Sequence, residues 1–297
     1  MPQTNTYYLG RVIKLGNLTA DMVVDAVLNP ATATSYGNSW SFFDAKELKT
    51  DGVEYLSAKL IKFNPEGEVV IADTSTRQEI VHLEPNLKIA ASHFIYIPSV
   101  SGIAFSKVYG HIEENHFSRR FCELIDQAKF QYLVECQIDF ITDLQTFSQK
   151  LLSLDGITKI SAVVHPPNPL FGPLWKELKE YIKFRRSDKM LIREEASIDA
   201  PLNSQLPFHV KKVVEQLPDD PYIPVDKIPI GDAAILMAAD GYGSGSVKGT
   251  RDGEKVVIKT SETIKNFIED EDAGVEKLFR SAYTIFNQIE TDRHMEH

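Results

Sequence analysis

The residues of this sequence with the clearest capacity for chemistry surround a glycine-rich turn between Gly241 and Gly249. Glycine lets a backbone approach a ligand closely, and the cations that follow the turn favour an anionic ligand. The pattern predicts a hairpin laid along phosphate groups, and the alternative is a flexible hairpin tip with no ligand. The residues that we expect to contact this ligand are Gly243, Gly245, Lys248 and Arg251, with Lys255 and Lys259 close by.

Two familiar nucleotide-binding motifs do not fit this turn. A P-loop requires Gly-Lys-Ser/Thr at its end, whereas here Lys248 precedes Gly249. A dinucleotide fingerprint requires a third glycine at position 246, where Ser246 stands, and a helix after the turn. The expected phosphate binding therefore depends on the nearby cations and on access to the glycine backbone. No cofactor is expected.

His165 is the candidate for proton transfer. It ends a predicted strand, Ile157 to His165, and the sequence Pro166-Pro167-Asn168-Pro169 follows it. A histidine at a strand end can serve as a general acid or base. The alternative is a rigid strand exit in which the ring makes only a local hydrogen bond.

The most basic window lies between Lys176 and Arg193, where seven cations stand against three anions. Arg185 and Arg186 fall at the end of a predicted helix in this window. Cations at a helix C-terminus complement the helix dipole, so a solvated helix end is one interpretation. A patch that contacts phosphate groups is the other.

Metal chemistry has little support in the sequence. His111 and His116 are five residues apart, which on a helix places them about 140° apart and on different faces. The His-x-Glu unit at His111 lacks the Pro-Cys-x-x-Cys partner of zinc deaminases. We therefore expect no metal site.

The surrounding elements predict an α+β fold. Residues 1–98 read as a β-rich N-terminal domain with one helix, Ala20 to Leu28 behind the N-cap Thr19, and an irregular stretch from Ala31 to Asp51. A hairpin turn is expected at residues 64–67. Residues 99–297 alternate strand and helix, which predicts a second domain with a ferredoxin-like mixed sheet and helices. Ile230 to Ser261 is expected to form a three-stranded antiparallel meander, followed by a C-terminal helix.

Composition and charge set the class of protein. The chain has 297 residues, of which 43% are hydrophobic and 25% charged, and its net charge is −10. Such a chain is globular, and any nucleic-acid contact must come from a local basic patch. Cys122 and Cys136 match no zinc or redox spacing and are expected as buried free thiols. The sequence shows no signal peptide and no apolar run near the ~20 residues that span a bilayer, which predicts a soluble cytoplasmic protein without a membrane partner.

A wider resemblance comes from the strand ending in His165-Pro166-Pro167-Asn168-Pro169, preceded by residues 154–160, LDGITKI, and from Asp240-Gly241-Tyr242-Gly243 before the glycine-rich strands. Over residues 93–262 the chain resembles an uncharacterised family of bacterial proteins associated with phage defence. The resemblance implies a defence context and nucleic-acid sensing. The glycine-rich hairpin also resembles that of CRISPR RNA-processing proteins of ferredoxin-like fold.

Three functions follow as hypotheses. The leading one is a bacterial defence-type protein that binds nucleic acid, RNA included, or a nucleotide. The second is a metal-independent ribonuclease with His165 as general base and Lys248 at the developing negative charge. The third is a non-catalytic, oligomerising subunit with a protein partner in a defence complex. A homo-oligomer is expected in each case.

Overall fold

The computed structural model describes residues 4–165, 176–197, 200–216, 222, 224 and 226–292, and it confirms an α+β fold with a β-rich N-terminal part. The chain divides into two compact units. Unit 1 comprises Met1–Ile13, Ile97–Ala104 and Ile138–His297, and unit 2 comprises Lys14–Tyr96 and Phe105–Gln137. Each unit contains segments from both sides of residue 98. The two units therefore differ from the predicted domains 1–98 and 99–297.

Unit 2 is built on strands that follow one another in sequence and space. The strand order within it is β5-β4-β3-β2, and β6 follows β5 along the chain with its residues divided between the two units. The turn between β2 and β3, and that between β3 and β4, place consecutive strands antiparallel. The bounds are β2 Ala33–Ser35, β3 Asn38–Thr50, β4 Val53–Asp73, β5 Gln78–Ile97 and β6 Gly102–Ser106. The prediction that residues 31–51 are irregular is therefore wrong, because polar and charged residues occupy the exposed positions of a regular strand.

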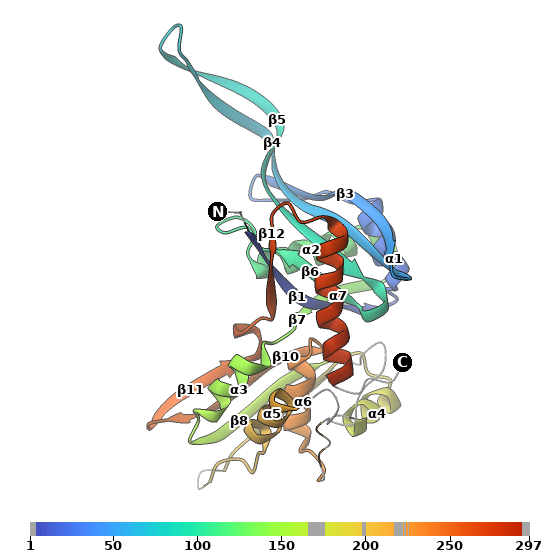
Figure 1. Ribbon diagram of the computed structural model, residues 1–297, viewed down its shortest axis with the longest axis vertical. Coiled ribbons are helices and arrows are strands. Elements are labelled where there is room, and N and C mark those ends of the chain that lie inside the picture. Colours follow the sequence, from blue (N-terminus) through green and yellow to red (C-terminus); the bar gives the residue numbers. More distant parts are fainter. Residues whose placement is uncertain are drawn as a thin grey trace. The chain divides into compact units, whose positions relative to one another are not determined.

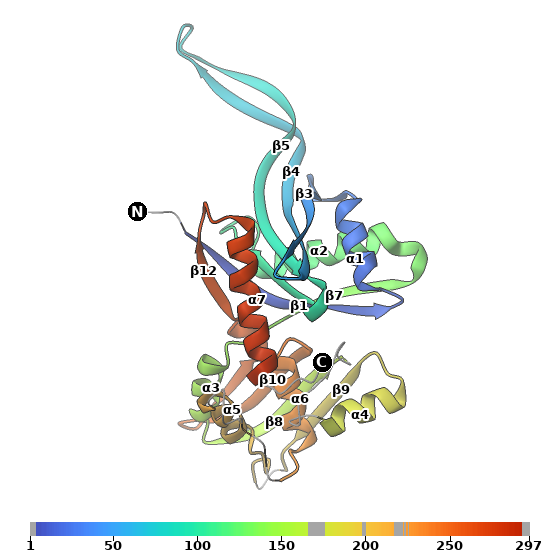
Figure 2. The ribbon, with the colours of Figure 1, turned by 45° about the vertical axis from the view of Figure 1, so that its right-hand side comes forward.

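Helices α1 (Ala20–Leu28) and α2 (Glu114–Lys129) pack against each other beside this sheet, as Figure 2 shows. The predicted start and end of α1 are confirmed, and the hydroxyl of Thr19 accepts a hydrogen bond from the backbone N–H of Met22 at 3.2 Å. The core of unit 2 is aromatic, with ring centroids 4.0 to 5.9 Å apart among Phe42, Phe94, Phe105, Phe117 and Phe121. Cys122 and Cys136 are buried free thiols.

Strands β4 and β5 form a long two-stranded ribbon that extends beyond β3 (Figure 1). The predicted turn at residues 64–67 is wrong, since β4 continues through Pro65 and the chain reverses only after Asp73. A proline is tolerated there because β3 no longer pairs with β4 beyond Phe63, which makes β4 an edge strand. The carboxylate of Asp73 fixes the turn by accepting hydrogen bonds from Ser75 and Thr76.

Unit 1 contains a separate four-stranded sheet of order β11-β10-β8-β9, antiparallel at each described pair. The strands are β8 Gly156–Val164, β9 Met190–Glu195, β10 Gly243–Arg251 and β11 Glu254–Lys259. Four helices accompany them: α3 Leu144–Leu152, α4 Lys176–Arg185, α5 Leu206–Glu215 and α6 Ile230–Ala239. Helix α6 lies against β8, β9 and β10, and α4 packs against α6.

The first strand of the predicted meander is instead helix α6. Gly231 through Ala239 are all buried, so every face of this helix meets protein. A short segment that is apolar all round has no period that distinguishes a buried helix from a buried strand. The remaining two strands of the meander, β10 and β11, are confirmed as an antiparallel hairpin.

The N- and C-terminal segments of unit 1 come together. Strand β1 (Thr4–Gly16) pairs antiparallel with β12 (Asn266–Asp270), and β7 (Val134–Phe140) also pairs with β1. Helix α7 (Val275–Asp292) buries Leu278, Phe279, Ala282 and Phe286. Within the described ranges, no helix is both long and apolar enough to cross a membrane.

Candidate functional site

One face of the β8–β11 sheet carries most of its positive charge. Side chains alternate along a strand, and on β10 the inward set, Gly245 and Val247 among them, lies toward α6. The outward set forms what we call the basic sheet face. Its charged members are Lys159, Arg193, Glu195, Lys248, Lys255 and Lys259, with Ser161, Ser246 and Thr250 between them and Leu191, Val163 and Val257 as apolar members.

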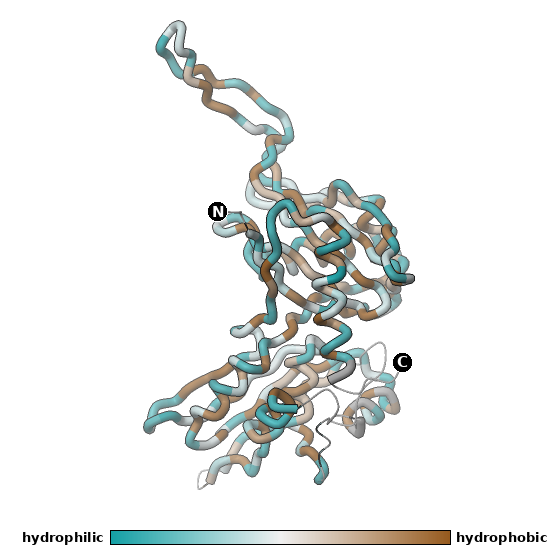
Figure 3. Tube along the Cα trace, in the orientation of Figure 1, coloured by the Kyte–Doolittle hydropathy of each residue, from teal (hydrophilic) through white to brown (hydrophobic). Residues whose placement is uncertain are grey.

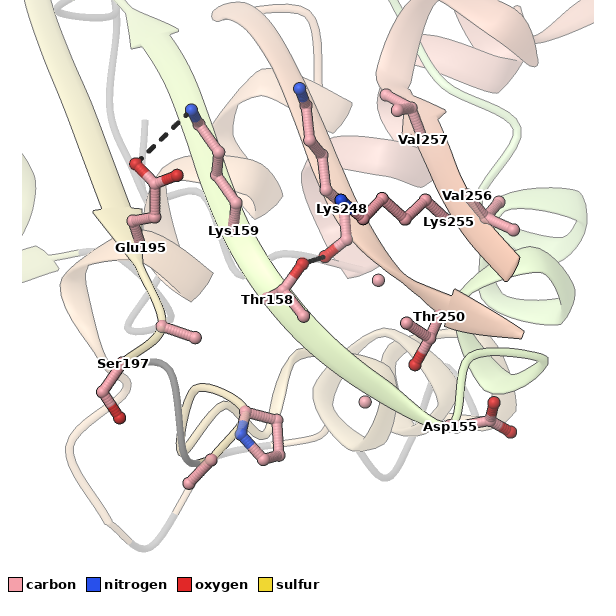
Figure 4. Close-up of a pocket in the computed structure, with 15 residues that line it drawn as sticks. Asp155, Thr158, Lys159, Glu195, Ser197, Lys248, Thr250, Lys255, Val256 and Val257 are labelled. Carbon is pink, nitrogen blue, oxygen red and sulfur yellow. Dashed lines mark hydrogen bonds and ion pairs between the residues drawn. The ribbon is translucent and has the colours of Figure 1, made fainter. Parts of the chain in front are cut away.

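Two lysines stand directly opposite each other at the centre of this face. Lys159 on β8 pairs in register with Lys248 on β10, and their side chains project side by side (Figure 4). The register shifts here, so that Thr158 is an extra residue whose hydroxyl donates to the backbone oxygen of Lys248 at 3.3 Å. Like charges opposite each other destabilise a sheet, and bulges are common next to binding sites. The arrangement costs stability and concentrates positive charge.

Glu195 is the one carboxylate among the charged members of the basic sheet face. It accepts a hydrogen bond from Arg193 at 3.0 Å and lies 3.6 Å from the Lys159 Nζ. The hydrogen bond from Arg193, and then the charge of Lys159, lower the pKa of Glu195 below its usual value. Glu195 therefore stays ionised at neutral pH and offsets part of the charge of these two cations.

The other three cations carry no such compensation. Among the described residues, Lys248, Lys255 and Lys259 form no ion pair, and all three are exposed. A groove with a volume of about 710 Å³ crosses the strands at Lys159, Lys248 and Lys255, and Ser197 and Pro201 line its side. Asp155 lies at one end of it. The groove can therefore receive an extended anionic ligand across the sheet.

His165 lies away from this face. Its side chain is 0% exposed, its backbone N–H donates to Tyr242 O at 3.0 Å, and its Nδ1 lies 3.1 Å from Asp188 O. The Nε2 atom is 3.8 Å from a carboxylate oxygen of Asp139, which is also buried. A general base must reach the proton that it removes. The surroundings of His165 fit the alternative of a locally bonded strand exit. The residues after it, 166–169, lie outside the described residues.

The two predicted binding glycines have packing roles. Gly243 has a φ of +150°, and a Cβ there would lie 2.1 Å from Val163 O. A Cβ on Gly245 would lie 2.6 Å from the Ile235 Cδ1 on α6. Both positions therefore require glycine because neighbouring atoms of the same chain leave no room for a Cβ. The neighbour is a backbone oxygen of β8 at Gly243 and a side chain of α6 at Gly245.

The predicted arginines also lie off the basic sheet face. Arg185 ends α4, and Arg186 adopts a φ of +51°, where the backbone N–H of Ser187 donates to Ile182 O at 3.2 Å. This is a Schellman-type helix end, in which the left-handed backbone conformation of Arg186 terminates α4. The side chain of Arg186 is exposed. Arg251 donates to the Ser153 hydroxyl just after α3.

Of the seven predicted site residues, Lys248 alone is on the basic sheet face. From the basic window, Arg193 joins it through β9, together with Lys255 and Lys259 from the hairpin. Sequence reasoning missed Lys159. Its signal was the alternation of Lys159, Ser161 and Val163 in the strand before His165, which places a cation on the side opposite Ile160 and Ala162.

Among the described residues, no three His, Cys, Asp or Glu side chains gather closely enough to hold a metal ion. No protein-family model matches the chain, and comparison with curated proteins finds no significant relative.

Proposed function

We propose that this protein binds nucleic acid through the basic sheet face, with the phosphate backbone as the contacted part. One observation carries the proposal: five cations gather on one exposed sheet face beside one Glu, in a chain with a net charge of −10. Local cation clusters of this kind attract polyanions even when the whole protein is acidic.

The chemistry of the face favours backbone contact over base reading. Its outward members are lysines, an arginine, one glutamate, hydroxyls and aliphatic side chains, with no aromatic residue among them. Sheets that read single-stranded bases stack them on aromatic rings. Lysine and serine side chains instead contact phosphate oxygens, which carry no sequence information directly. The proposed binding is therefore insensitive to sequence.

Binding without cleavage is favoured over the ribonuclease hypothesis. That hypothesis assigned the general base to His165, whose ring is completely buried. Lys248 can stabilise negative charge, but a cation without a general base does not make up a catalytic site. The defence context implied by the resemblance stays a prediction, and so does a protein partner in a defence complex.

The test is fluorescence anisotropy with a labelled single-stranded RNA, the same sequence as DNA, and a duplex, each over a salt series. Lys248→Ala is expected to weaken binding to each sequence to a similar extent and to reduce the salt slope by about 1, as loss of one phosphate contact does. The measured quantities are the dissociation constant and its dependence on salt.

Lys211→Ala is the matched control, since Lys211 is an exposed lysine on helix α5 rather than on the sheet. It should leave affinity and salt slope unchanged. Absence of binding at low salt, or equal effects of the two substitutions, would contradict the proposal.

A further inference from the structure

The distal half of the β4–β5 ribbon has apolar side chains without a core. We call residues 66–73 and 78–85 the distal ribbon. Val70 and Val81 are each 58% exposed and Leu83 is 71% exposed, whereas the core of unit 2 lies elsewhere. Figure 3 shows this apolar stretch between hydrophilic segments. Exposed apolar clusters on a projecting element mark interaction surfaces.

A two-stranded ribbon is marginally stable alone in water. Here the pairing is regular from Glu66 opposite Pro85 to Asp73 opposite Gln78. Within the described chain, no third strand pairs with the distal ribbon, so both of its edges expose backbone hydrogen-bonding groups. Partner binding would supply contacts that the ribbon lacks by itself.

Both faces of the distal ribbon carry exposed apolar side chains, but the three most exposed of them, Val70, Val81 and Leu83, lie on the same face. Residues opposite each other in an antiparallel pair point to the same side. Val70 with Val81 and Glu68 with Leu83 therefore share one face, which we call the acidic ribbon face. Its members are Glu66, Glu68, Val70, Ala72, Glu79, Val81, Leu83 and Pro85. It combines three carboxylates with an apolar centre.

Charge decides which partner fits. Residues 66–85 contain five carboxylates and one arginine. Two such ribbons packed on each other would gather carboxylates, and like-charge contact disfavours association. The acidic ribbon face instead requires a partner that is basic around apolar side chains. The basic sheet face has this composition, with five cations around Leu191, Val163 and Val257.

We propose that the acidic ribbon face of one copy docks on the basic sheet face of a second copy. Such a contact joins two different surfaces, so it is heterologous and leaves a free ribbon and a free sheet face at the ends. Assembly then grows with concentration and weakens with salt. The inference uses the face proposed above for nucleic acid, so nucleic acid and a second copy compete for it.

The test is light scattering over a concentration series at low and high salt, on three proteins. The unmodified chain should show concentration-dependent association that salt suppresses. The ribbon variant Glu68→Lys with Glu79→Lys and the face variant Lys248→Glu with Lys255→Glu should each associate at least about tenfold more weakly, since two ion pairs are reversed. A 1:1 mixture of the two variants should regain association, because each chain supplies a surface that complements the other.

Glu84→Lys is the matched control for the ribbon, as Glu84 is exposed on its opposite face beside Leu83. It should associate like the unmodified chain. A monomer at all concentrations would overturn the proposal, and so would a face variant that still self-associates, which indicates ribbon-to-ribbon contact. The ribbon variant keeps its basic sheet face, so its anisotropy titration with nucleic acid tests the proposed function separately.

Discussion

At the scale of single residues, Arg11 is a buried cation whose charge must be compensated inside unit 1. It is completely buried and donates from Nη1 to Val100 O at 2.6 Å and from Nε to Asp240 O at 3.1 Å. Its guanidinium lies 4.7 Å from the centre of the Tyr242 ring and 3.7 Å from a Glu290 carboxylate oxygen. One arginine thus links β1, the turn after α6 and the end of α7.

Replacing Arg11 by Met should cost about 3–5 kcal/mol of unfolding free energy, the usual effect of removing one partner from a buried ion pair. The loss arises because Glu290 loses the cation of its ion pair and the backbone carbonyls of Val100 and Asp240 lose their donor. Urea denaturation followed by circular dichroism measures it. Adding Glu290→Gln should restore part of the loss.

Arg119→Met provides the comparison, since Arg119 is exposed on α2. Exposed substitutions usually change stability by within about 0.5 kcal/mol. An Arg11→Met protein as stable as this control would show that the buried arginine contributes nothing beyond its volume.

At the scale of secondary-structure elements, the glycines of β10 shape the sheet. Gly243→Ala should destabilise the protein by more than the about 1–3 kcal/mol typical of a strained backbone conformation, because its Cβ also meets Val163 O. Thermal denaturation provides the measurement.

Gly253→Ala separates strain from contact. Gly253 has a φ of +81° and nothing within 4 Å of a Cβ, so its substitution should cost the strain alone. Equal losses at the two positions would mean that β8 moves away from Gly243 at no cost.

The sequence predicts elements better than it predicts the site. Helix α1 was predictable because Thr19 supplies a local cap and Asn29-Pro30 a local stop. Helix α6 was not predictable, because nine consecutive buried residues show no alternation of apolar and polar positions at helical spacing. The basic sheet face was predictable only as separate cations. Lys159 lies opposite Lys248 through pairing between residues 89 positions apart, and no local pattern encodes that register.

At the scale of the whole molecule, the distal ribbon can be removed without touching a core. Replacing residues 67–84 by Asn-Gly, a pair suited to a two-residue hairpin turn, deletes side chains that are nearly all exposed. The melting temperature should stay close to that of the unmodified chain, while association in light scattering is lost. A large fall in melting temperature would show that the ribbon stabilises the monomer.

The pairing of β1 with β12 has a consequence for synthesis on the ribosome. Thr4 pairs with Asp270 and β8 pairs with β10, so unit 1 cannot complete its strand pairing until residue 270 has been translated. Residues 14–137 hold all of unit 2. Unit 2 can therefore fold while the chain is still growing, whereas the first strand of unit 1 stays exposed to chaperones until β12 has been translated.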